Sequence, residues 1–236
     1  MKMIWFYDIY KQAVSLFNDP DITEAYDTNK IRFAKLMHPY LEASIPFFTN
    51  PSIIGRLLSD FEEPKGTTEI FISDGNTLTY NLSFTPDNIE NSLFEFIGDG
   101  KVIGGTYDKN SNTVIFDQKI ESGKEYSFEV YYGGKFTSEF QITSNSMLNA
   151  QIDVQVTGIL ARLLVKVWGE NTRNYLLDIQ NVLSDNDFKL HPNGPVLKAK
   201  VEWLNKIDEE TNQMQNKLAH IIRFGRTSSN WGRRYN

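Results

Sequence analysis

The sequence predicts an α+β protein in which a helical domain, built from both ends of the chain, carries an inserted antiparallel β-sandwich. Three observations lead to this prediction. Apolar residues recur at helical spacing before about residue 62 and again after Ser144. Between these segments apolar and polar residues alternate, which is the period of a strand with one buried face. Short turn sequences rich in Gly, Asn and Asp separate the alternating runs.

The length and composition are those of a globular protein. The chain has 236 residues, of which 40% are hydrophobic and 23% are charged, so it can bury a substantial core. We expect a first helical part at 1–64, an inserted β-sandwich at 65–143, a second helical part with a long C-terminal helix at 144–224, and a basic aromatic tail at 225–236.

Three short helices are expected in the first part. Proline inside a helix removes a hydrogen bond, so Pro39 should lie at a break or a kink. The helices are predicted from Trp5 to Phe17, ending at Asn18-Asp19-Pro20-Asp21; from Thr28 or Asn29 toward Leu41; and from the cap Asn50-Pro51-Ser52 onward.

Seven short strands are expected in the inserted part. Strict alternation is clearest at Leu78–Phe84 and Tyr126–Tyr132, and the turns include Gly98-Asp99-Gly100 and the pair Gly133-Gly134. This spacing suggests a small sandwich or barrel, loosely immunoglobulin-like, although the cysteines and tryptophan of antibody domains are missing. The runs lie at about 68–73, 77–85, 92–97, 101–107, 113–119, 125–132 and 135–142.

The second helical part is expected to contain a central core helix at Gln151–Trp168 and another helix at Asn171–Leu183. The last helix is predicted from Val196 to Arg223, with Gly225 ending it. Its apolar face is interrupted by the polar run Asp208–Gln213, so this helix should pack at its two ends and be solvated in the middle.

The charge changes sign at the end of the chain. Because the whole chain carries −6 and residues 211–236 carry +5, residues 1–210 carry −11. The five cations are interleaved with aromatic residues, and Trp, Tyr and Arg are the usual anchors of protein interfaces. We therefore expect a partner-binding segment rather than an inert tail, with the contacts made by Phe224, Arg226, Trp231, Arg233, Arg234 and Tyr235.

No catalytic site, cofactor site or metal site is expected. The glycines at 98, 100 and 104 join strands and do not have dinucleotide-loop spacing. The paired acids Glu62-Glu63, Asp185 with Asp187, and Glu209-Glu210 fit solvated turns or caps better than an acid-base pair. There is no cysteine, and the three histidines, His38, His191 and His220, are interpreted as surface or cap residues.

No segment has the length and apolarity of a membrane span or of a signal peptide. We therefore expect assembly in the cytoplasm. The pI near 5.2 argues against nucleic-acid binding by the whole body, because phosphate contacts require a basic face.

The layout resembles the head-to-tail connector, or neck adaptor, proteins of tailed bacteriophages. The resemblance is carried by short N-terminal helices containing Phe17-Asn-Asp-Pro20, a β insertion, a core helix, and a long final helix ending in a basic aromatic tail. It implies a ring of about twelve copies, formed with neighbouring copies of the same chain. It also implies a place in the virion neck, with the segment 196–236 reaching onto the portal protein, a downstream tail or neck protein below, and genomic DNA passing without sequence-specific binding. The inserted sandwich departs from the all-helical minimal members of that family.

Two other functions stay open at this stage. In the first, the sandwich is a glycan- or surface-binding module of a phage fibre or baseplate, with sugars stacking on Tyr107, Tyr126, Tyr131 and Tyr132. Tyrosines on a strand are more often packing residues. In the second, the basic tail alone binds DNA, although five cations neutralise few phosphates.

Overall fold

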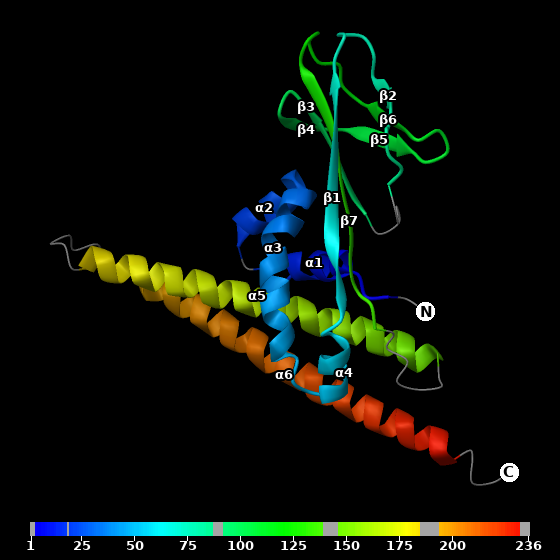
Figure 1. Ribbon diagram of the computed structural model, residues 1–236. Coiled ribbons are helices and arrows are strands. Elements are labelled where there is room, and N and C mark those ends of the chain that lie inside the picture. The colour runs from blue at the N-terminus through cyan, green and yellow to red at the C-terminus, as the bar shows by residue number, and fades with distance from the viewer. Residues whose placement is uncertain (1–2, 18, 87–91, 139–145, 185–193, 232–236) are drawn as a thin grey trace.

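The computed structural model describes residues 3–17, 19–86, 92–138, 146–184 and 194–231. It is an α+β fold with antiparallel sheets, as predicted. Figure 1 shows two long helices lying side by side as a base, a group of short helices against them, and a two-stranded ribbon that rises from the base to a set of smaller strands. The ribbon is the connection between the helical part and the β part.

Two of the short helices of the first part begin at a side-chain cap, Asp19 or Asn29, whereas the other three have none. Asp19 accepts a hydrogen bond from the Asp21 N–H at 3.2 Å and starts a helix that the sequence analysis missed, with Pro20 in its first turn. Pro39 lies inside a helix without ending it. The elements are α1 (Phe6–Val14), α2 (Pro20–Thr28), α3 (Lys30–Ser44), the 3-10 helix η1 (Ile45–Phe47) and α4 (Ser52–Leu57).

The β part consists of two facing sheets. A four-stranded sheet has the order β1-β7-β3-β4, and a three-stranded sheet has the order β2-β6-β5. The strands are β1 (Phe61–Ile72), β2 (Thr79–Asn81), β3 (Leu93–Gly98), β4 (Lys101–Ile103), β5 (Gly105–Asp108), β6 (Thr113–Phe116) and β7 (Glu125–Phe136).

The predicted turn at Gly98-Asp99-Gly100 is confirmed. Gly98 pairs with Lys101 across the turn, and the two central residues have φ values of 50° at Asp99 and 75° at Gly100. Two consecutive residues with positive φ are typical of the tight hairpins that an Asp-Gly pair favours.

The predicted turn at Gly133-Gly134 is wrong. β7 runs through this pair to Phe136 and stays paired with β1, with Phe61 opposite Phe136. Gly134 has a φ of 64°, and a Cβ there would lie 2.9 Å from the Phe6 ring. The glycine therefore serves a close approach between strand and helix rather than a reversal of the chain.

Two long helices make the base. α5 (Ser146–Ser184) is continuous where two helices were predicted, and α6 (Gly194–Trp231) continues past Gly225. Gly169 lies at the predicted break in α5, but a Cβ there would lie 2.5 Å from Leu204 of α6. It is a point of close contact between the two helices, and a single glycine costs a helix only about 1 kcal/mol.

The middle of α6 is packed, which corrects the prediction of a solvated middle. Thr211 is 1% exposed, and its hydroxyl donates to the Ile207 carbonyl at 2.6 Å. Lys166 of α5 pairs with Asp208, and Arg162 pairs with Glu210 at 3.5 Å. Asp208, Glu210 and Thr211 therefore face α5, while Glu209, Asn212 and Gln213 on the same run stay exposed.

Two hydrophobic cores result. The larger core joins both ends of the chain, because residues of α1, α3, α5 and α6 pack in it together with Phe136 of β7. The smaller core lies between the two sheets and contains Leu82, Phe96, Val114, Phe116, Tyr126, Phe128 and Val130.

Candidate functional site

One end of the α5–α6 hairpin brings together the start of α5 and the end of α6 (Figure 1). The antiparallel register shows this, because Gly169 faces Leu204 while Gly158 faces Met214. Continuing the same register places Met147 near the level of Phe224. Residues far apart in the sequence thus share one end of the base.

Large apolar side chains are exposed at this end. Met147 is 82% exposed, Val154 67% and Phe224 66%. We call these three residues the hairpin-end patch. Met147 and Val154 lie seven residues apart and so share a face of α5; exposed apolar residues that share a face are typical of an interaction surface, whereas single ones are common on any protein.

The six predicted partner-binding residues begin at this patch. The Phe224 ring lies 6.2 Å from the His220 ring, stacked at 16°. Arg226 and Trp231 lie on the last turns of α6, where the structure describes only the backbone. Arg233, Arg234 and Tyr235 lie outside the described residues.

Three of the four tyrosines considered for sugar binding contribute to packing. Tyr126 is 0% exposed, and its hydroxyl donates to the Gln118 carbonyl at 2.8 Å. The Tyr107 ring lies 5.9 Å from the Phe128 ring. Tyr131 is partly buried against the helical core, and the side chain of Tyr132 lies outside the described residues. A residue as buried as Tyr126 cannot stack on a sugar.

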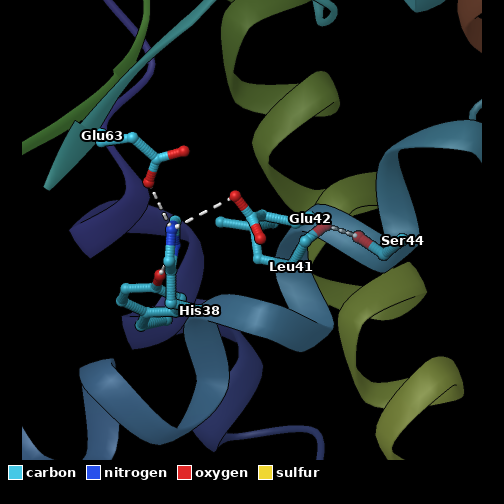
Figure 2. A network of polar contacts seen from close by, with 6 residues as sticks. His38, Leu41, Glu42, Ser44 and Glu63 are labelled. Atoms are coloured by element: carbon cyan, nitrogen blue, oxygen red, sulfur yellow. Dashed lines mark hydrogen bonds and ion pairs between the residues drawn. The ribbon is translucent and has the colours of Figure 1, made fainter.

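A second candidate site, made of polar side chains, lies where α1, α3 and β1 meet. His38 and Glu42 lie one turn apart on α3, and Glu63 comes from β1 (Figure 2). The His38 Nε2 lies 2.8 Å from Glu63 Oε2 and 3.5 Å from Glu42 Oε1. On the other side of the ring, Nδ1 lies 3.2 Å from the Tyr10 hydroxyl. We call His38, Glu42 and Glu63 the junction triad.

Two tyrosines beside the triad are held in their neutral form. Burial raises the pKa of Tyr10 well above its ordinary value, and the nearby Tyr131, Glu42 and Glu63 act in the same direction. Burial, assisted by Glu63 and Glu42, raises the pKa of Tyr131 to about 12. Near neutral pH both therefore keep their hydroxyl protons.

The sequence analysis did not predict the contacts of this site. His38 was interpreted as a surface or cap residue, but its side chain is only 15% exposed. Glu63 was interpreted as part of a solvated face or cap; its side chain is indeed 60% exposed, but it lies on a strand and contacts His38. The one local signal was the spacing of His38 and Glu42, which places both on one face of a helix. Glu63 joins them only through the fold.

Comparison of the chain with protein-family models, curated proteins and solved structures finds no match. Among the described residues, no helix is long and apolar enough to cross a membrane. The described residues form an α+β protein with a base of two long helices, two antiparallel sheets between its helical segments, and exposed apolar side chains on α5 and α6.

Proposed function

We propose that the protein is a structural subunit of a tailed-phage virion, a head-to-tail connector of the neck. In this proposal it forms a ring with neighbouring copies and docks on the portal protein through the end of α6. The observation that supports it best is the hairpin-end patch, with Phe224 66% exposed where α6 continues toward the basic aromatic segment. The proposal assigns no catalytic residue.

The charge distribution fits such a role. Residues 211–236 carry +5, while residues 1–210 carry −11. Cations at the end of α6 can pair with carboxylates of a partner, and opposite charges across an interface favour fast and specific association. An acidic body lets genomic DNA pass without binding to it. A downstream tail or neck protein would bind elsewhere on the ring, and assembly would take place in the host cytoplasm.

The shape also fits a ring. A subunit of a closed ring meets its neighbours through two different faces. The long base and the β part standing away from it offer separate faces for this purpose (Figure 1). The length of α5 and α6, 39 and 38 residues, allows the base to reach beyond the body of one subunit.

The test is binding to the portal protein encoded in the same genome, measured by native mass spectrometry and by titration. Phe224→Ala should weaken binding by roughly tenfold or more, because buried aromatic anchors dominate interface energies. Leu36→Ala is the matched control, because Leu36 is also an exposed apolar helical residue, 52% exposed, but lies on α3. Equal portal binding by Phe224→Ala and Leu36→Ala would contradict the proposal.

A further inference from the structure

The junction triad has the composition of a cation site. Each of its three residues offers one ligand atom, and these atoms lie within 4.8 Å of one another. Two of the residues come from consecutive turns of α3 and the third from β1. We propose that the triad binds one divalent transition-metal ion, with Zn²⁺ as the best match.

The spacing of the ligand atoms is close to that of a tetrahedral site. Zinc lies about 2.0 to 2.2 Å from nitrogen and oxygen ligands, so two ligands of a tetrahedral site are about 3.4 Å apart. The Nε2 of His38 lies 3.5 Å from Glu42 and 2.8 Å from Glu63. All three ligand atoms lie within 4.8 Å of one another, and the Glu42 and Glu63 side chains are 40% and 60% exposed, so both carboxylates have room to move onto a bound ion.

The surroundings of His38 orient the ring as metal sites do. A ligating histidine usually forms a hydrogen bond through its second nitrogen, which fixes the tautomer and the direction of the ligating atom. Tyr10, 2% exposed, occupies that position with its hydroxyl 3.2 Å from Nδ1. When Nε2 binds a metal, Nδ1 carries the ring proton and donates a hydrogen bond to the Tyr10 hydroxyl oxygen. The Phe6 ring, 5.5 Å from the imidazole, packs beside it.

The ligand types select the class of ion. One imidazole with two carboxylates suits zinc and its first-row neighbours, whereas magnesium and calcium sites are built from oxygen ligands. Two carboxylates also balance the charge of a divalent ion. Because the glutamates are partly exposed, water completes the coordination. The bound ion would fasten β1 to α3, and with it the ribbon to the helical core.

The test uses the full-length protein, freed of metal with a chelator and titrated with Zn²⁺ in a calorimeter. We expect saturable binding of one ion per chain and a higher melting temperature with Zn²⁺, because a ligand that binds only the folded state stabilises it. Glu63→Gln and His38→Ala should abolish this binding. Tyr10→Phe should weaken it by about tenfold to a hundredfold, the usual effect of losing an outer partner.

Glu62→Gln is the matched control, because Glu62 is the neighbouring carboxylate on β1 but pairs with Lys135 at 3.2 Å. Glu63→Gln also keeps the test independent of folding, since Glu63 is an exposed side chain whose loss leaves both cores intact; circular dichroism checks this. If Zn²⁺ bound Glu63→Gln and Glu62→Gln as tightly as the wild type, or if His220→Ala abolished binding instead, the proposal would be wrong.

Discussion

Glu95 connects the β part to the helical part through a buried carboxylate. It lies on β3 and is 4% exposed, and its Oε1 accepts a hydrogen bond from the Ile31 N–H at the start of α3, at 3.0 Å. Within the described residues its Oε2 accepts no hydrogen bond. Burial raises the pKa of Glu95, with the Ile31 N–H opposing the shift and the nearby Glu129 adding to it. The ionised carboxylate is therefore destabilising in the folded state.

Glu95→Gln should become more stabilising relative to the wild type as pH rises. Below the ordinary pKa of 4.5, Glu95 is protonated in the folded and the unfolded chain. Above that pH the unfolded state loses this proton first, so the folded wild type binds more protons than the unfolded state. Its free energy of unfolding therefore falls as the pH rises. The difference between variant and wild type should grow through this range and then level off above the folded-state pKa. Urea unfolding of both proteins at a series of pH values measures it.

Glu121→Gln is the control for this series, because it removes one carboxylate from an exposed turn. If the difference in free energy of unfolding between Glu95→Gln and the wild type stayed constant over the whole pH series, the conclusion that burial disfavours the ionised Glu95 would be wrong.

Gly105→Ala should destabilise the β part. Gly105 begins β5, directly after the chain crosses from the four-stranded to the three-stranded sheet. A Cβ there would lie 2.4 Å from the Phe96 ring and 2.8 Å from the Ile115 carbonyl oxygen. Overpacking of this kind costs roughly 2 to 3 kcal/mol, which thermal unfolding would detect.

Gly66→Ala is the matched substitution on β1, where the nearest atom would lie 3.7 Å away, an ordinary contact. It should change stability by less than about 0.5 kcal/mol. Similar effects of the two substitutions would contradict the packing described at the sheet crossing.

Single residues show where sequence patterns stop being informative. The hairpin at Asp99-Gly100 could be predicted because the turn chemistry is local. Gly133-Gly134 has the same local character, yet its glycine is required by Phe6, far away in the sequence. His38 is similar, since its contact with Glu63 depends on where β1 passes α3. Patterns of neighbouring residues predict local structure but not contacts of this kind.

At the scale of the helices, a buried polar residue of α6 makes hydrogen bonds that join this helix to the first helical part. Gln215 is 3% exposed and faces the segment between η1 and α4. Its Oε1 accepts from the Thr49 N–H at 3.1 Å and the Asn50 N–H at 2.8 Å, while its Nε2 donates to the Phe47 carbonyl at 3.3 Å. One side chain thus holds a turn of the first helical part against the last helix.

Gln215→Leu should lower the free energy of unfolding by about 2 to 3 kcal/mol, because it leaves buried backbone groups without partners. Gln213→Leu is the matched control: Gln213 is exposed and contacts Glu209 at 3.5 Å. Denaturant unfolding compares the two. A loss of stability in Gln213→Leu as large as that in Gln215→Leu would count against the role of Gln215.

The lengths of the elements were harder to predict than their types. Helical periodicity located α5 and α6, but Gly169 and Gly225 suggested ends that the structure does not have. Packing against Leu204 accounts for Gly169. β1 and β7 were predicted too short. The first half of β1, from Phe61, pairs with the last part of β7, up to Phe136, beside the helices and outside the sandwich.

The whole molecule consists of two hydrophobic cores joined by the ribbon of β1 and β7. Its α+β class and the insertion of strands between helical segments could be predicted from the change of hydrophobic period alone. The candidate docking site could be predicted only in part. Charge and aromatic content pointed to the end of α6, but Met147 and Val154 reach the same end through the antiparallel pairing of α5 with α6.

The most direct test of the docking proposal removes residues 225–236 and measures binding to the portal by native mass spectrometry. The last buried residue of α6 among the described side chains is Ile222, so the shortened chain should keep its melting temperature and lose only the small helical circular dichroism signal of residues 225–231. We predict that the full-length protein forms a ring on the portal and that the shortened protein stays folded but unbound. A shortened protein that still assembles on the portal would contradict the account.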